Sequence, residues 1–157
     1  MLKKHPFLGS VIFTFIAPAF VAGVMPFILL SYLRVATFHF PGRIFMASLL
    51  LITGLMIYIA CVNSFIKKGK GTPSPTAPPT QLVVSGLYRY SRNPMYVGII
   101  SIIIGEGLWF AEASVLIWAA LFLMGVHAWI LNYEEPKLRS CFGSSYHDYC
   151  QRVRRWV

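Results

Sequence analysis

The sequence carries little charge. Asp, Glu, Lys and Arg make up 12% of its 157 residues, and only five residues are acidic. A soluble domain of this length usually has about twice that charged fraction. Hydrophobic residues make up 57% of the chain, and the mean hydropathy is +0.64. Together these values argue against a soluble domain and indicate an integral membrane protein.

Cysteine is also scarce, and no spacing of metal ligands stands out. Three cysteines argue against a disulfide framework. We expect Cys141 and Cys150 to face the cytoplasm, where thiols stay reduced. The four histidines are scattered, so no Cys/His pattern predicts a metal site. His127 lies in an apolar segment, where a lone imidazole is a candidate functional group but more often forms a helix-packing hydrogen bond.

What the sequence does have is four long apolar segments, at residues 7–33, 44–66, 94–111 and 113–133. A membrane-spanning helix needs about 20 such residues, within a range of roughly 17 to 25. We therefore predict an all-α polytopic membrane protein, a single domain over residues 1–157, with four transmembrane helices and a C-terminal amphipathic interfacial helix. Lys3 and Lys4 before the first segment resemble a signal peptide, but the full spanning length favours an uncleaved helix.

The positions of the basic residues predict the orientation of the chain. If the N-terminus is cytoplasmic, four spans place the loop 67–93 and the tail 134–157 on the same side. That side then holds Lys3, Lys4, Lys67, Lys68, Lys70, Arg89, Arg92, Lys137, Arg139, Arg152, Arg154 and Arg155. The other side holds only Arg34 and Arg43. This split follows the positive-inside rule, so the net charge of +9 reflects topology and anionic lipid rather than nucleic acid.

Residues 71–80 form a proline-rich stretch with four prolines, which excludes a helix and favours an extended course. The segment has two interpretations, which composition alone leaves equal. It is either a semi-rigid spacer or a lid over a site formed by the residues that follow.

The segment Gly86-Leu87-Tyr88-Arg89-Tyr90-Ser91-Arg92-Asn93-Pro94-Met95-Tyr96-Val97-Gly98 places many hydrogen-bonding groups just before an apolar segment. A segment that only anchors the start of a transmembrane helix at the membrane interface needs one or two aromatic residues and a cation. The pattern therefore indicates a polar ligand site at the membrane surface.

Glu106, farther along the same segment, is a costly intramembrane carboxylate, but it lies about 9 Å from the predicted helix end, which favours a structural role.

A second polar cluster follows the fourth apolar segment. Glu134 and Glu135 stand at the C-terminal end of a helix, where the macrodipole disfavours negative charge. Nearby cations would compensate their charge, and Arg89 and Arg92 are candidates because they are predicted on the same side of the membrane. Either these groups form a structural ion pair, or they hold a zwitterionic ligand between them.

Residues 142–145 predict a helix stop followed by a new N-cap. After them, one aromatic and apolar face is formed at spacings of three, four and three by Tyr146, Tyr149, Val153 and Trp156. The cations of the same segment are Arg152, Arg154 and Arg155. This pattern predicts a basic amphipathic helix on the inner leaflet.

These two clusters resemble those of the isoprenylcysteine carboxyl methyltransferase family, especially its small bacterial members. The similarity covers residues 71–156 and rests on two anchors. The first is Gly86-x-Tyr88-x-x-x-Arg92-Asn93-Pro94-x-Tyr96-x-Gly98, and the second is Glu134-Glu135 followed by Leu138, Phe142-Gly143, Tyr146, Tyr149, Val153, Arg155 and Trp156.

The resemblance implies S-adenosyl-L-methionine as cofactor, a bacterial inner-membrane location and no metal. The implied cofactor contacts are Thr80, Gln81, Leu82, Val83, Tyr88, Asn93, Pro94, Met95, Tyr96, Glu134 and Glu135. The implied catalytic residues are Arg92, Asn93 and Glu134. Eukaryotic members have histidine where this chain has Asn93, and a substrate-orienting arginine where it has Ile130. An amide does not titrate near neutral pH, so we expect no acid–base role at Asn93.

The expected function is methyl transfer to a membrane-embedded lipophilic acceptor that enters laterally from the bilayer. Carboxyl O-methylation of an isoprenylcysteine-like substrate is the first interpretation. The alternative within the same chemistry is a phospholipid amine N-methyltransferase, which shares the Asn-Pro-x-Tyr and Glu-Glu-Pro elements. Alternatives of another class are a nicotinamide-dependent membrane reductase and a non-catalytic lipid-binding protein.

Overall fold

The computed structural model describes residues 15–64, 67 and 82–157, and within these ranges the chain is helical with no β-strand. Residues 15–19 are helical and lead into the first named element. The elements are η1 (Phe20–Val24), α2 (Met25–Tyr32), α3 (Arg43–Ser64), η3 (Gly86–Arg89), α4 (Pro94–Phe110), α5 (Ala113–Trp129), η4 (Ile130–Glu134) and α6 (Glu135–Arg152). Here η1 and η4 are π-helical and η3 is a 3₁₀ helix. The predicted all-α class is confirmed.

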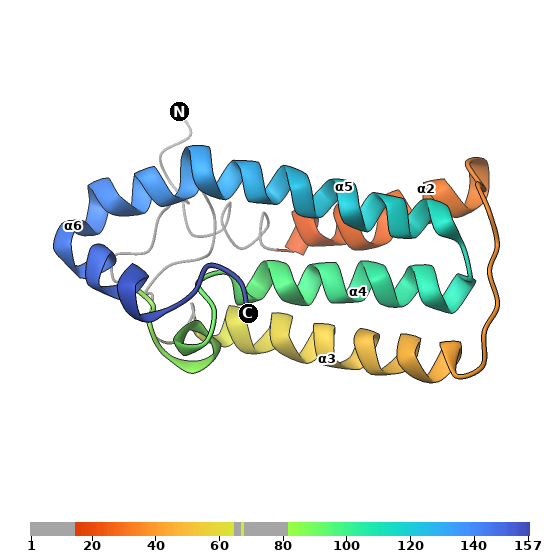
Figure 1. Ribbon diagram of the computed structural model, residues 1–157, viewed down its shortest axis with the longest axis horizontal. Coiled ribbons are helices and arrows are strands. Elements are labelled where there is room, and N and C mark those ends of the chain that lie inside the picture. Colours follow the sequence, from red (N-terminus) through yellow and green to blue (C-terminus); the bar gives the residue numbers. More distant parts are fainter. Residues whose placement is uncertain (1–14, 65–66, 68–81) are drawn as a thin grey trace, which may run out of the picture.

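The predicted number of four spans is not confirmed. Three helices are long and apolar enough to cross a membrane, namely Phe15–Tyr32, Arg43–Ser64 and the continuous helix Ala113–Arg152. α4 is shorter, at 17 residues. It nevertheless runs the length of the bundle between α3 and α5, as Figure 1 shows. The proline-rich stretch 71–80 and the start of the first predicted span lie outside the described residues.

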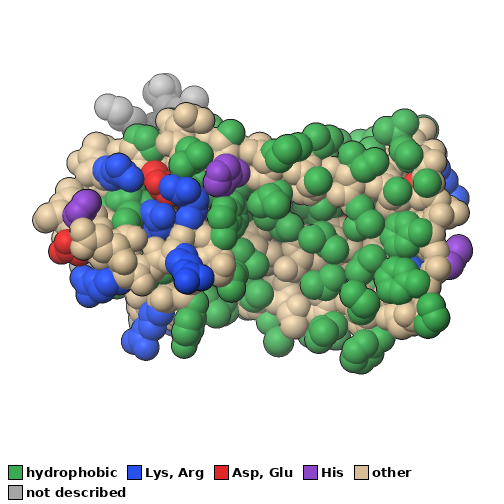
Figure 2. Space-filling model, in the orientation of Figure 1, with side chains coloured by type: hydrophobic (Ala, Val, Ile, Leu, Met, Phe, Trp, Pro, Cys, Tyr) green, Lys and Arg blue, Asp and Glu red, His purple; other side chains and the backbone are tan. Residues whose placement is uncertain are grey.

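The surface of the bundle is apolar, as expected for helices in lipid. Large hydrophobic side chains such as Phe27 and Phe45 are 67% and 73% exposed. Figure 2 shows hydrophobic side chains over the helical bundle and Lys and Arg side chains gathered at the end formed by α6. On this face most of the positive charge therefore lies at the α6 end, and the apolar side chains cover the helices.

Glycines allow α3 and α4 to approach closely. A Cβ added at Gly54 would lie 2.7 Å from the Gly98 carbonyl oxygen, and one added at Gly98 would lie 2.9 Å from the Gly54 carbonyl oxygen. Backbone thus packs on backbone, which only small residues permit. Ile103 and Val115, both fully buried, join α4 to α5 in the core beside this contact. The close packing fixes α4, whose first turn carries Pro94 and Tyr96 of the motif.

The opposite end of the bundle is closed by Glu112, which joins the segment 33–42 to the α4–α5 turn. Its carboxylate accepts hydrogen bonds from the backbone N–H groups of Val35 (2.8 Å) and Ala36 (3.3 Å). The Val35 hydrogen bond holds the pKa of Glu112 below its usual value. Arg43 donates to the last carbonyls of α4, those of Leu108 and Trp109. These contacts are structural.

α5, η4 and α6 form one continuous helix that bends back at its end. Gly143 leaves helical geometry, with φ of 52° and ψ of −125°, which agrees with the predicted stop there. The chain then returns toward α4, and Tyr146 and Tyr149 become buried in protein. An interfacial C-terminal helix is therefore not confirmed, because half of its predicted aromatic face packs on the protein.

Candidate active site

The C-terminal segment 153–157 covers the start of α4, where the first motif lies. The Arg92 N–H donates to the Arg154 carbonyl at 2.9 Å, and the Asn93 side-chain amide donates to the Arg155 carbonyl at 3.0 Å. The Ser91 hydroxyl donates to the same Arg155 carbonyl at 3.3 Å. Asn93 is buried, and its amide N–H is used to hold the C-terminal segment in place.

The buried Glu135 is the centre of an ion-pair cluster. Its carboxylate accepts two hydrogen bonds from Arg155, at 2.7 and 3.2 Å, and lies 3.2 Å from Arg92 and 3.7 Å from Arg139. The hydrogen bond to Glu135 raises the pKa of Arg155. One carboxylate faces three guanidinium groups, so the cluster keeps an excess of positive charge. Glu135 therefore forms the structural ion pair, which is the first of the two interpretations of the glutamate pair.

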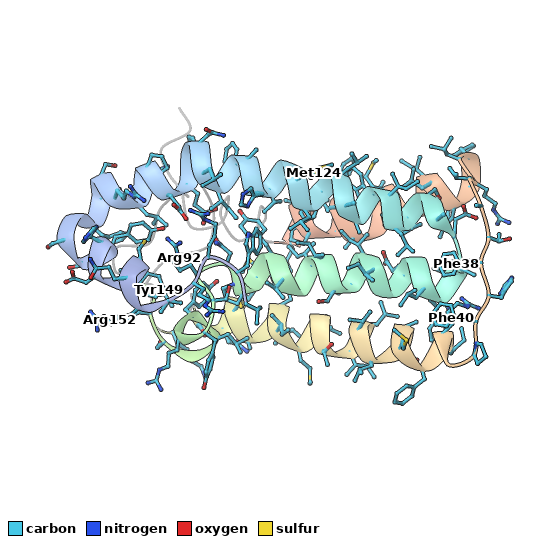
Figure 3. All side chains as sticks on the ribbon, in the orientation of Figure 1. Phe38, Phe40, Arg92, Met124, Tyr149 and Arg152 are labelled. Carbon is cyan, nitrogen blue, oxygen red and sulfur yellow. The ribbon has the colours of Figure 1, made fainter. Side chains whose placement is uncertain are left out.

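Arg92 has a donor left over. One of its terminal nitrogens contacts Glu135 and the Cys150 sulfur, yet its Nε is buried and has no hydrogen-bond partner among the described residues. A buried guanidinium N–H without a partner is costly, and such a group in a native site points to a missing ligand or water. Figure 3 shows Arg92 with Tyr149 where α6 and the C-terminal segment meet the start of α4.

Glu134 has a different environment from its neighbour. It accepts a hydrogen bond from the Tyr96 hydroxyl at 3.1 Å, and within the described ranges no Lys or Arg forms an ion pair with it. Burial raises the pKa of Tyr88 well above its usual value, and the neighbouring Cys61 and Glu134 raise it further. Two tyrosines and an uncompensated carboxylate therefore lie together on one side of the site.

Apolar residues complete this side. Val83 and Tyr88 are buried with Cys61 of α3, and Met95 packs against them. The Tyr149 hydroxyl donates to the Tyr88 carbonyl at 2.7 Å, which fixes η3 against α6. Leu82 is half-buried, whereas Pro94 is buried at the first turn of α4. Thr80 and Gln81 lie outside the described residues, and Arg89 is exposed.

Sequence reasoning missed the role of the C-terminal arginines and of Trp156. The basic residues were interpreted as lipid-binding, yet Arg155 pairs with Glu135 inside the protein. The Trp156 indole N–H donates to His127 Nδ1 at 3.2 Å, so His127 accepts a packing hydrogen bond as expected. Glu106 Oε2 is buried and has no hydrogen-bond partner among the described residues. The available signal for the ion-pair cluster was a basic run that follows two adjacent glutamates, with Arg155 lying 20 residues after Glu135.

The fold and the site define a helical membrane protein with a polar, buried site at one end of its bundle. Residues 42–145 match the phospholipid methyltransferase family, and the chain belongs to this family of membrane methyltransferases. The predicted resemblance is thereby confirmed, because isoprenylcysteine carboxyl methyltransferase-like enzymes fall in the same family. An uncharacterized protein of Haemophilus influenzae is 30% identical over 63 residues, which are 40% of this chain and 100% of that protein. No solved structure matches the chain.

Proposed function

We propose that this chain is an S-adenosylmethionine-dependent methyltransferase that acts on a lipophilic acceptor in the membrane. The observation that carries the proposal is the division of the site into two electrostatic halves. Among the described residues, one half holds Glu134 without a pairing cation, and the other holds Arg92, whose buried Nε has no hydrogen-bond partner. Such a site suits a small molecule that carries both signs of charge.

S-adenosylmethionine has this distribution of charge, with a sulfonium and an ammonium as well as a carboxylate. Glu134, with Tyr96 and Tyr88 beside it, would hold the cationic groups. Arg92 would hold the carboxylate, since charge-assisted hydrogen bonds from guanidinium to carboxylate are strong. Val83 offers an apolar wall for the nucleoside. When bound, the cofactor supplies an electrophilic methyl group.

The remaining predicted contacts differ in what supports them. Met95 and Pro94 lie in the same first turn of α4 as Tyr96, which supports a place beside the ligand. Asn93 and Glu135 support the site from behind, because their polar groups bond the C-terminal segment. We therefore propose that Arg92 and Glu134 are the charges that face the ligand. Asn93 is then a positioning residue.

The residues would act mainly by positioning the reactants. Methyl transfer needs the nucleophile and the methyl carbon held in line at about 3 Å, and this orientation supplies much of the rate. A carboxylate acceptor is already deprotonated at neutral pH and needs no base, which supports carboxyl O-methylation of an isoprenylcysteine-like lipid. The family match supports the second candidate, N-methylation of a phospholipid amine. In both cases the acceptor would enter from the bilayer.

We also propose that both termini face the cytoplasm of a bacterial inner membrane. The Lys and Arg side chains gathered at the α6 end support this orientation, because positive residues favour the cytoplasmic side. The site would then open toward the compartment that supplies the cofactor.

Equilibrium binding to the purified protein in micelles tests the cofactor site. S-adenosylhomocysteine should bind at micromolar levels, and reduced nicotinamide cofactor should not. Glu134→Gln should weaken S-adenosylhomocysteine binding by about 10- to 100-fold, since a hydrogen bond to a charged group contributes about 1.5–3 kcal/mol. Asp148→Asn makes the same chemical change at an exposed carboxylate and should bind like the wild type. If Glu134→Gln combined with Tyr88→Phe leaves binding intact, the site assignment fails.

The identity of the acceptor needs a second experiment. Membranes containing the protein are incubated with methyl-labelled S-adenosylmethionine, and the labelled lipid is treated with base. A methyl ester releases its label as methanol, whereas a methylated amine keeps it. Label that stays in the non-volatile fraction, on the headgroup amine, would favour the phospholipid amine over the carboxylate.

A further inference from the structure

A groove of about 740 Å³ lies between α4 and α5 and ends at the C-terminal segment. Its walls are mostly apolar and include Val97, Ile100, Leu123, Met124 and Leu131. Leu123 and Met124 are 40% and 60% exposed on the outside of the bundle. Figure 3 shows Met124 on α5 in the helical part of the molecule, away from the arginine cluster. The groove thus opens on the surface that apolar helices present to lipid.

The groove adjoins the candidate cofactor site through three elements. Val97 follows Tyr96 directly, Asn132 precedes Glu134 by two residues, and Trp156 follows Arg155. The groove and the site therefore share α4, η4 and the C-terminal segment. A chain lying in the groove would bring its head toward the site.

Most polar groups of the groove are bonded to their own helix. The Ser101 hydroxyl donates to the Val97 carbonyl at 2.8 Å, and the Asn132 amide donates to the Ala128 carbonyl at 2.8 Å. His127 differs, because it contacts Trp156 from another element. The two rings stack at an angle of 26°, with centroids 6.1 Å apart.

The hydrogen bond to Trp156 assigns the tautomer of His127. The indole N–H is a donor only, so His127 Nδ1 must carry the lone pair that accepts it. In the neutral ring, Nε2 then carries the proton and is a donor. Among the described residues, no group forms a hydrogen bond with Nε2. Trp156 is itself held, because the preceding Arg155 is bonded to Glu135 and Asn93.

We propose that His127 is a positioning residue that donates its Nε2–H to an anionic oxygen in the head of the lipid acceptor, while the acceptor's apolar chain lies in the groove. The proposal rests on the proposed methyltransferase function and deepens it. The Glu135 cluster carries an excess of positive charge, and its Arg155 directly precedes Trp156 in the sequence. This charge favours an anionic lipid head over a neutral one. Because Nδ1 is occupied, His127 acts as a donor and not as a base.

Fluorescence quenching by brominated lipids in micelles tests this role without turnover. The signal of Trp156 is the difference between the wild type and Trp156→Phe. A dibrominated stearic acid should quench it at a roughly tenfold lower concentration than the methyl ester of the same acid, which lacks the anionic oxygen. Dibrominated phosphatidic acid, compared with the same neutral ester, shows whether phosphate or carboxylate is the preferred source of that oxygen.

Two variants separate donation from packing. His127→Phe keeps a stacked ring but no donor, and should abolish the preference for the acid. His127→Gln keeps an N–H donor, and should retain a preference of several-fold. Equal quenching by acid and ester in the wild type, or an acid preference that survives in His127→Phe, overturns the proposal.

Binding of S-adenosylhomocysteine to the same samples separates this proposal from the proposed function. Cofactor binding with no preference for the acid refutes the role of His127 and leaves the methyltransferase intact. A preference for the acid in a protein that binds no cofactor refutes the methyltransferase and leaves a lipid-binding groove.

Discussion

The contact between α3 and α4 provides a quantitative test of the fold at Gly98. A Cβ at Gly98 would lie 2.9 Å from the Gly54 carbonyl oxygen and 3.2 Å from the Tyr58 backbone nitrogen. Ordinary van der Waals contact begins at 3.4 Å. Both near atoms belong to the backbone and cannot rotate away, so in Gly98→Ala the helices must separate by roughly 0.5 Å. Overpacking of this kind typically costs about 1–3 kcal/mol.

The helix propensity of alanine partly offsets this cost, by about 1 kcal/mol. Gly125→Ala isolates that term, because nothing lies within 4 Å of a Cβ at this position of α5. The free energy of unfolding of Gly98→Ala should therefore fall about 1–3 kcal/mol below that of Gly125→Ala. Denaturant titration of both variants in the same detergent measures this difference.

A second variant checks that the shared contact is the cause. Gly54→Ala should destabilise in the same direction, since its Cβ would lie 2.7 Å from the Gly98 carbonyl oxygen. The double variant should lose less than the sum of the two, because the helices need to separate only once. If Gly98→Ala is as stable as Gly125→Ala, the backbone contact between α3 and α4 is refuted.

Two further predictions concern single hydrogen bonds. The Val35 amide keeps the pKa of Glu112 low in the folded protein. The contribution of Glu112 to the free energy of unfolding is therefore fully present above the unfolded pKa of about 4.3, and it is lost as pH falls through the folded pKa. Glu112→Gln should lack this acid-dependent loss in thermal unfolding at varied pH, and an equal acid slope in both proteins contradicts the role. Tyr149→Phe removes the hydrogen bond to the Tyr88 carbonyl and should cost about 0.5–1.5 kcal/mol in denaturant titration, whereas Tyr90→Phe at an exposed ring should cost nothing measurable.

The helices could be predicted from the sequence because lipid requires unbroken apolar runs. The second apolar segment, 44–66, corresponds to α3 (Arg43–Ser64), and 94–111 corresponds to α4 (Pro94–Phe110). The length of the last helix could not be predicted in this way. Hydropathy falls after residue 133, yet Pro136 is accommodated in the first turn of α6 and the helix continues.

The meeting of the two motifs was also predictable. Tyr96 lies in the first turn of α4 and Glu134 at the end of η4, so the antiparallel hairpin of α4 and α5 returns them to the same end. Their side chains lie 3.1 Å apart. The docking of the C-terminal segment was not predictable, because a basic and aromatic pattern fits a lipid surface as well as a buried carboxylate. A basic residue in a sequence shows that its partner is negative, but not whether that partner is a lipid headgroup or a carboxylate of the protein.

The divergence of the two glutamates follows from helix geometry. Successive residues on a helix point about 100° apart, so adjacent side chains face different neighbours. Glu135 therefore faces the arginines, and Glu134 turns toward Tyr96. Removing the charge of Glu135 would leave three guanidinium groups without a carboxylate and disturb the fold. Among the described residues no Lys or Arg pairs with Glu134, so we propose that its carboxylate is the one that acts on a ligand.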